Sequence, residues 1–189
     1  MKEQIKTYLN RYVSFSDNEI NEIYGRLSSQ TLQKKKFLLH EGQICNHKYF
    51  IIKGLVRLFY IDFNGNEKVI QFAIENWWVT NVESFIKETP SSISIQALEE
   101  TIILSIKKNE LEELYQSIPK LERLFRLITE NMLIAIQKRN EFYMKASSKD
   151  RYYSLINNIP NLAQRVPQYM IASYLDVTPE YLSEIRKNS

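Results

Sequence analysis

The chain has 189 residues, of which 44% are hydrophobic and 25% are charged, and its formal net charge is +3. These values are ordinary for a globular protein, and they exclude a disordered chain and a membrane protein. The amino-terminal stretch has no apolar run of signal-peptide length, and the single cysteine, Cys45, can neither close an internal disulfide nor supply four thiolates to an iron–sulfur cluster. We therefore expect a cytoplasmic protein.

Two short helices are predicted in the first stretch, from about Gln4 to Leu32. Ser16 or Asp17 can cap the second of them, and Glu19 then lies in its first turn. The apolar residues at helical spacing are Ile5, Leu9, Val13, Ile20, Ile23 and Leu27.

From Phe37 to Ile106 the sequence consists of short β-branched and aromatic runs separated by turn residues. The clearest hairpin joins Val56–Ile61 to Val69–Ala73, because Asn64 and Gly65 between them can adopt the positive φ of a tight turn. Several short strands at regular spacing predict a β-sandwich or a β-barrel.

After Pro119, which suits the first turn of a helix, apolar residues recur every three or four positions up to about Lys145. A helix of this length, about 40 Å, is longer than most single domains need. We expect it to pack on something besides its own sheet. Ser147 and Ser148 can break or re-cap the helix, and a compact helical segment follows from Arg151 to Ser189.

The end of this segment, "QYMIASYLDVTPEYLSEIRKN", has the spacing of a helix-turn-helix. Ala172 is small at the place where two such helices cross, and Asp176 tolerates the left-handed backbone of the turn. Thr178 is a good N-cap and Pro179 a good first residue for the second helix. The apolar residues that would form the shared core are Ile171, Leu175, Val177, Leu182 and Ile185.

The second helix of this motif is expected to enter the major groove of double-stranded DNA. Glu180 can accept a hydrogen bond from a cytosine amino group, and Arg186 and Lys187 suit phosphates. The predicted DNA-binding residues are Gln168, Thr178, Pro179, Glu180, Tyr181, Ser183, Arg186 and Lys187. The last quarter of the chain, from residue 138, has eight basic against five acidic side chains, which agrees with a polyanion as partner. Glu180 and Glu184 argue the other way, because they would repel phosphate.

The order of these parts resembles the CRP/FNR family of bacterial transcription regulators, and "HEGQICNHKYFIIKGLVRLFY" is similar to the stretch in which Gly42 and Gly54 make turns around a strand. The resemblance implies an α+β fold: a double-stranded β-helix (jelly-roll) sensor of the cyclic-nucleotide-binding type in residues 1–116, a dimerisation helix in 117–147, and a helix-turn-helix domain in 148–189. It implies a homodimer on a palindromic operator, with DNA, RNA polymerase and an unidentified small-molecule effector as further partners. The dimer-helix residues are then Leu121, Leu124, Phe125, Ile128, Met132, Ala135 and Ile136.

Cyclic AMP is not the expected effector. Family members that bind it hold the ribose and phosphate with a Gly-Glu pair and a nearby arginine, because a buried phosphate needs charged donors. Here Ser91 stands where the arginine is expected, and the Gly-Glu pair is missing. The residues that could still line a ligand pocket are Trp77, Trp78, Thr80, Asn81, Glu83, Ser91 and Ser92, although the two tryptophans are equally suited to packing in a sheet.

Two other functions remain open at this point. A ligand-binding or protein-interaction module that has lost DNA binding would explain Glu180 and Glu184. A cupin-like metalloenzyme would use the cluster His40, Glu41, Cys45 and His47, but the spacing fits no standard zinc site. The sequence has no nucleophile elbow, phosphate loop or HExxH motif, so we expect a protein that is not an enzyme and holds no metal or cofactor.

Overall fold

The computed structural model describes residues 1–159 and 161–187. Helices α1 (Lys2–Leu9) and α2 (Asp17–Gly25) come first, as predicted. Ser16 begins α2 with a capping box: its hydroxyl accepts from the Glu19 N–H, and the Glu19 carboxylate accepts from the Ser16 N–H. This local exchange of hydrogen bonds satisfies donors that a helix start leaves unpaired.

The centre of the molecule is a β-roll made of two four-stranded antiparallel sheets. One sheet has the order β1-β8-β3-β6, and the other has the order β2-β7-β4-β5. The strands are β1 (Ser28–Leu32), β2 (Phe37–Leu39), β3 (His47–Lys53), β4 (Val56–Ile61), β5 (Glu67–Ala73), β6 (Trp78–Val79), β7 (Ser94–Ala97) and β8 (Thr101–Lys107). Strands β1, β2 and β6 are not among the sequence predictions. The residues of β1 lie at the end of the stretch predicted to be helical and are almost all exposed, and β2 and β6 are too short to have a period.

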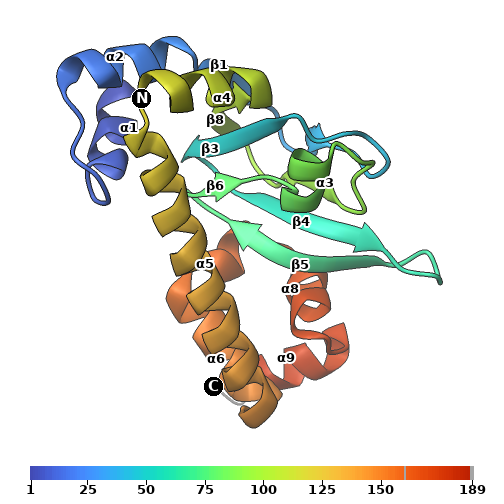
Figure 1. Ribbon diagram of the computed structural model, residues 1–189. Coiled ribbons are helices and arrows are strands. Elements are labelled where there is room, and N and C mark those ends of the chain that lie inside the picture. Colours follow the sequence, from blue (N-terminus) through green and yellow to red (C-terminus); the bar gives the residue numbers. More distant parts are fainter. Residues whose placement is uncertain (160, 188–189) are drawn as a thin grey trace.

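The predicted hairpin is β4–β5, and it projects from the roll (Figure 1). Gly65 has a φ of 81°, as the turn requires, whereas Asn64 does not take a positive φ. Instead the Asp62 carboxylate accepts from the backbone N–H groups of Asn64 and Asn66, both at 2.9 Å. The chain is therefore reversed by an Asx-type turn at Asp62 together with the positive φ of Gly65.

Helices α3 (Val82–Lys87) and α4 (Lys108–Ser117) belong to the roll, and α5 (Lys120–Lys145) then runs away from it. Its 26 residues span about 39 Å, close to the predicted length. Ser147 re-caps the chain and begins α6 (Ser148–Asn158), again with a capping box. Helices α7 (Leu162–Arg165), α8 (Gln168–Leu175) and α9 (Pro179–Lys187) complete the carboxy-terminal helical unit. Within the described residues, no helix is long and apolar enough to cross a bilayer.

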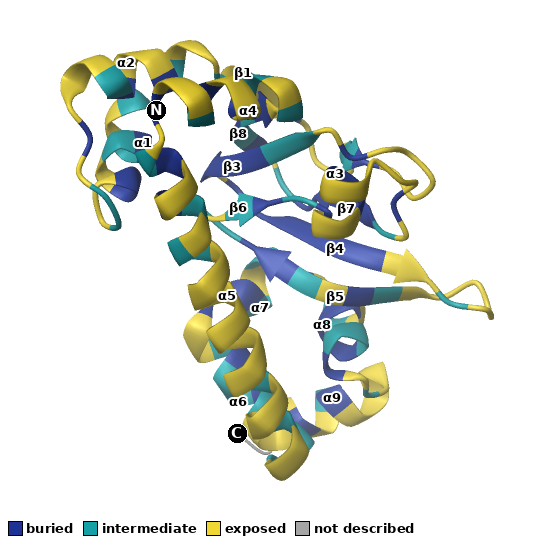
Figure 2. Cartoon of the chain, in the orientation of Figure 1, coloured by how far each residue is buried: buried dark blue, intermediate teal, exposed yellow. Residues whose placement is uncertain are grey.

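Two apolar cores result. The first fills the roll and continues under α1, α2, α4 and the start of α5. The second joins the outer face of β4 and β5 to the carboxy-terminal helices, so these helices lie against the sheet that contains β4 and β5. Figure 2 shows both cores in dark blue and most of α5 beyond the roll in yellow, as exposed.

The first turns of α5 pack against the roll of the same chain. Leu121 and Leu124 are fully buried in the first core, and Phe125 and Ile128 pack against it. The prediction that Leu121 and Leu124 form a dimer seam is therefore wrong, because their side chains are already used inside the chain. Met132, Ala135 and Ile136, further along the helix, are exposed.

Candidate DNA-binding surface and sensor pocket

Helices α8 and α9 form the predicted helix pair. Asp176 ends α8 in the left-handed conformation, with φ 54° and ψ 48°, and the Val177 N–H returns to the Ala172 carbonyl at 3.0 Å. The Thr178 hydroxyl accepts from the Tyr181 N–H at 3.2 Å, which caps α9, and Pro179 is its first residue. The apolar residues in the shared core are Ile171, Ala172, Leu175, Leu182 and Ile185, all buried.

The other face of α9 is open to solvent. Thr178, Pro179, Glu180, Tyr181 and Glu184 are exposed, as are the two basic residues at the helix end, Arg186 and Lys187. A groove of about 500 Å³ runs beside α9 and is lined by Gln168, Pro179, Glu180, Ser183, Glu184 and Lys187. The structure thus gathers the predicted DNA-binding residues on one surface.

Gln168 has a second role that the sequence does not indicate. Its amide oxygen accepts from Arg186 at 3.1 Å, and its amide nitrogen donates to the Pro179 carbonyl at 3.4 Å. These bonds tie the start of α8 to both ends of α9. The hydrogen bond to Gln168 therefore positions the Arg186 side chain.

The predicted sensor-pocket residues are partly brought together, but as a bonded network. The Asn81 side-chain nitrogen donates to the Ser91 hydroxyl at 2.9 Å, and the Asn81 oxygen caps α3 by accepting from the Ser84 N–H at 3.0 Å. Both Asn81 and Ser91 are buried. Thr80 donates to the His47 carbonyl at 2.9 Å.

The other residues of that set lie apart from the network. Trp78 packs between Phe50 and Phe125, with ring centroids at 5.2 and 5.3 Å, so it joins the roll to α5. Trp77 is 40% exposed, Ser92 is exposed, and Glu83 pairs with Lys87 on the surface. The expectation that the tryptophans could pack in the sheet holds for Trp78.

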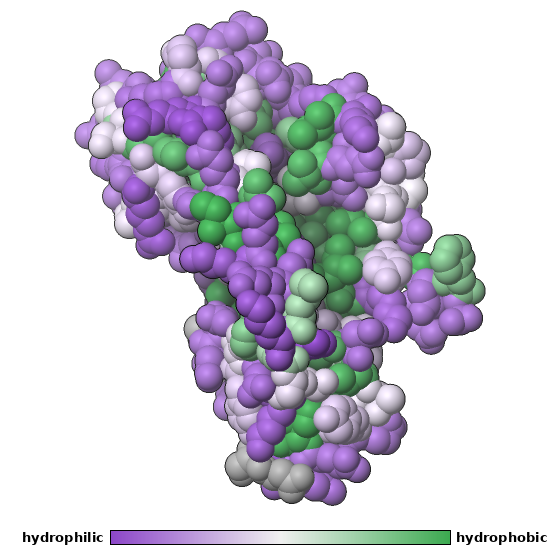
Figure 3. Space-filling model, turned by 60° about the horizontal axis from the view of Figure 1, so that its bottom comes forward, coloured by the Kyte–Doolittle hydropathy of each residue, from purple (hydrophilic) through white to green (hydrophobic). Residues whose placement is uncertain are grey.

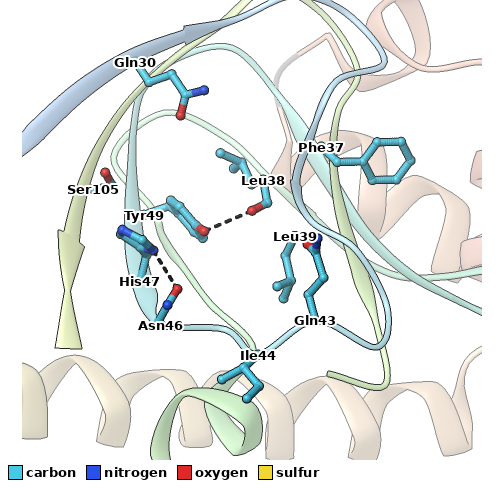
Figure 4. A pocket seen from close by; sticks show the side chains of 10 residues that line it. All are labelled: Gln30, Phe37, Leu38, Leu39, Gln43, Ile44, Asn46, His47, Tyr49 and Ser105. Carbon is cyan, nitrogen blue, oxygen red and sulfur yellow. Dashed lines mark hydrogen bonds between the residues drawn. The ribbon is translucent and has the colours of Figure 1, made fainter. Parts of the chain in front are cut away.

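A hollow of about 630 Å³ lies elsewhere, between β2 and β3 (Figure 4). None of the seven predicted pocket residues lines it. Its wall includes the ring of His47, which stacks on Tyr49, and the side chains of Gln43 and Asn46. Burial lowers the pKa of the His47 imidazole, and the nearby Lys107 ammonium lowers it further. Among the described residues that line this hollow, none carries a carboxylate or ammonium group.

The possible metal ligands do not assemble. His40 stacks on Phe37 at 4.0 Å, and Cys45 is buried with its sulfur 3.2 Å from the Thr80 hydroxyl. Among the described residues, no group of three or more histidine, cysteine or acidic side chains could hold a metal ion. The structure therefore offers the cupin-like alternative no support.

Residues 29–118 match the cyclic nucleotide-binding domain family. Gly42 and Gly54, with φ values of 83° and 110°, make the turns before and after β3 that the sequence predicts for such a domain. No curated protein matches the chain in sequence.

Solved structures resemble the chain over nearly its whole length. They include the c-di-GMP responsive global regulator CLP of Xanthomonas campestris (13% identity, TM-score 0.73, covering 92% of this chain and 91% of that one). FixK2 of Bradyrhizobium japonicum is also similar (13% identity, TM-score 0.72, covering 86% of this chain and 83% of that one). So is the catabolite activator protein of Thermus thermophilus (16% identity, TM-score 0.61, covering 96% of this chain and 85% of that one). The chain thus has the fold of CRP/FNR-family transcription regulators, with the cyclic nucleotide-binding jelly roll, the long α5 and the carboxy-terminal helices in the same order.

Proposed function

We propose that the protein is a DNA-binding transcription regulator that acts as a homodimer on a palindromic operator and does not bind cyclic AMP. The observation that carries this proposal is the helix pair α8–α9, whose shared core is buried while the polar face of α9 is exposed. The fold shared with CRP/FNR-family regulators supports it. In this proposal the protein works in the cytoplasm, answers to a small-molecule effector and acts on RNA polymerase.

The chemistry of α9 suggests a role for each exposed group. Glu180 accepts from a cytosine amino group in the major groove, while Thr178 and Tyr181 reach bases or phosphate. Arg186, held by Gln168, and Lys187 neutralise phosphates. Specificity then comes from the start of α9 and affinity from its end.

The middle of α5 supports a homodimer. Every residue from 129 to 138 is exposed in the single chain, and four of them are large and apolar: Met132, Leu133, Ile134 and Ile136, which are 42 to 54% exposed. Figure 3, in which the bottom of the molecule comes forward, shows apolar surface in the middle of the view, beside a hydrophilic strip, and a mostly hydrophilic rim. A second copy of α5 is the partner we propose for this stretch, because two long helices can bury their apolar residues against one another.

The DNA proposal is tested by selecting bound duplexes from a random pool with the full chain and titrating the selected duplex with salt. We expect a palindrome with half-sites about one DNA turn apart. Lys187→Ala should reduce the salt slope by about one unit, and Glu180→Gln should relax the preference at one base pair. Lys34→Ala, an exposed change on the roll, is the control and should alter neither. Failure to enrich any sequence at low salt would overturn the proposal.

The homodimer is tested by light scattering on the purified chain, whose monomer mass is 22.5 kDa. We expect twice this mass for the wild type and a shift toward the monomer for Ile136→Glu. Gln33→Glu adds the same charge at an exposed position of the roll, away from α5, and should leave the mass unchanged. A wild-type chain that is monomeric at every concentration would contradict the dimer without touching the DNA proposal.

A protein-interaction module that has lost DNA binding is the second candidate. The observation that favours it is the acidic lining of the groove beside α9, where Glu180 and Glu184 face solvent. It predicts no salt-dependent affinity for any duplex, so the DNA selection distinguishes the two.

A further inference from the structure

Arg165, the last residue of α7, crosses from the carboxy-terminal helical unit to the roll. Its Nε and one terminal nitrogen donate to the two oxygens of Glu99, at 3.2 and 2.6 Å, and the same terminal nitrogen donates to Glu75 at 3.1 Å. The Arg165 side chain is only 19% exposed. This is a two-pronged, partly buried contact, which is the strong form of an ion pair.

The carboxylates that Arg165 binds come from turns at one end of the roll. Glu75 follows β5, and Glu99 lies between β7 and β8. Glu75 also accepts from the Gly54 N–H, in the turn between β3 and β4, at 2.8 Å. Gly54 has a φ of 110°, and an added Cβ would lie 2.5 Å from the Thr101 hydroxyl, so this turn packs closely against the start of β8. One arginine is thereby bonded, directly or through Glu75, to three turns of the sensor.

A second set of contacts holds the same unit at the edge of the sheet. The Ser173 hydroxyl of α8 accepts from the Val69 N–H at 3.0 Å and donates to the Glu67 carbonyl at 2.9 Å. Strand β5 is an edge strand, so Ser173 fills hydrogen bonds that a further strand would otherwise make. Because Val69 donates across the junction, its amide reports whether the unit is docked.

We propose that Arg165 is a positioning residue: while it spans Glu75 and Glu99, the roll and the helix-turn-helix move as one body, and when this contact breaks the unit is released to turn about the junction between α5 and α6. The orientation of α9 then depends on the geometry of the three sensor turns. The docking is independent of the proposed function. Its consequence for DNA recognition rests on that function.

The docking is tested by amide hydrogen exchange on the full chain. In Arg165→Gln we expect the Val69 amide to exchange at least about tenfold faster, because charge-assisted bonds are lost and two carboxylates are left facing each other. The amides of the central strands β4 and β7 should keep their protection. Lys68→Gln is the matched control: it removes the exposed pair with Asp176, at 3.4 Å across the same junction, and should leave Val69 protected.

Two further variants separate positioning from folding. The charge swap Arg165→Glu with Glu99→Arg should restore the protection of Val69, whereas either single change should not. If Arg165→Gln also removes the protection of β4 and β7, the milder variant Glu99→Gln is measured, because it keeps the bond between Arg165 and Glu75. Its Val69 amide should exchange faster while the amides of β4 and β7 stay protected. Wild-type protection of Val69 in Arg165→Gln, or failure of the swap to restore it, would overturn the proposal.

The consequence for recognition is measured on the duplex selected by the wild type. Arg165→Gln should change its dissociation constant by about tenfold or more, since α9 is no longer held at one angle, and the charge swap should reverse the change. An unchanged constant would overturn this part. If the wild type binds no duplex, the proposed function fails while the exchange experiment still decides the docking.

Discussion

The side-chain nitrogen of Asn81 donates a hydrogen bond of 2.9 Å to the hydroxyl of Ser91, and both residues are buried. Ser91 in turn donates to the Ile93 carbonyl at 2.7 Å, and its own carbonyl accepts from the Gly42 N–H at 2.7 Å. The region that the resemblance assigns to the ribose and phosphate of a cyclic nucleotide is therefore occupied by a neutral network whose members satisfy one another.

Cyclic AMP should not bind. The phosphate would enter a buried place without a guanidinium, and it would have to break the bond between Asn81 and Ser91. Isothermal titration with millimolar nucleotide should give no binding heat. Ser91→Arg alone should not create a site, because the Gly-Glu pair would still be missing. Saturable binding to the wild type would show the prediction to be wrong.

Asn81→Ala should destabilise the chain by about 1 to 2 kcal/mol, since it removes the N-cap of α3 and one of the two donors to the buried Ser91 hydroxyl, the other being the Ile93 N–H. The measurement is urea unfolding. Asn157→Ala, at an exposed position on α6, is the comparison and should change the free energy of unfolding little.

Gly54→Ala should cost about 3 kcal/mol, because φ is positive and a Cβ would approach the Thr101 Cα to 2.8 Å and the Glu100 carbonyl to 2.9 Å. Gly25→Ala is the matched control, since nothing lies within 4 Å of the added Cβ and the residue ends a helix. It should be neutral or stabilise by about 0.5 kcal/mol. Equal unfolding midpoints for the two variants would contradict the strain at Gly54.

Lys48→Met should raise stability by about 1 kcal/mol. Burial lowers the pKa of the Lys48 ammonium, which lies 4.8 Å from the Phe85 ring centroid and 5.2 Å from that of Phe125. Among the residues that the structure describes, Lys48 forms no ion pair. Methionine retains the aromatic contact without a desolvated charge. Lys53→Met, at the exposed end of the same strand, should leave the unfolding midpoint where it is.

Stability should fall as the pH rises above about 10. Burial raises the pKa of Tyr8, Tyr49, Tyr115 and Tyr174 above the ordinary value of 10. The unfolded chain therefore loses these protons first as the pH rises. Each of these tyrosines then lowers the free energy of unfolding by about 1.4 kcal/mol per pH unit above about pH 10. Lys48 changes the free energy of unfolding in the opposite direction, because its pKa is lowered in the folded chain. The four tyrosines outweigh this single group.

The check is urea unfolding at a series of alkaline pH values, with tyrosinate absorbance followed in parallel. Tyr49→Phe should make the fall less steep. A free energy of unfolding that stays level between about pH 9 and pH 11 would contradict the raised tyrosine pKa values.

What could be predicted from the sequence is local. Ser16, Ser147 and Thr178 cap helices by bonding to N–H groups three residues ahead, and Asp176 turns the chain with its own backbone, so these features need only neighbouring residues. The periodicity of α5 and the hairpin at Gly65 are of the same kind. The family resemblance added the order of the parts.

The tertiary structure decided which surfaces meet. Strand β1 exists because Ser28 pairs with Ser105, 77 residues away, and nothing in its own exposed residues indicates that pairing. Leu121 and Met132 fall on the same stripe of one helix, yet the roll covers only Leu121, because α5 has left the roll by the time it reaches Met132. Likewise the bonds of Arg165 to Glu75 and Glu99 join residues 90 and 66 positions apart. A repeat along the chain reveals which side chains share a face, but only the folded chain determines what that face contacts.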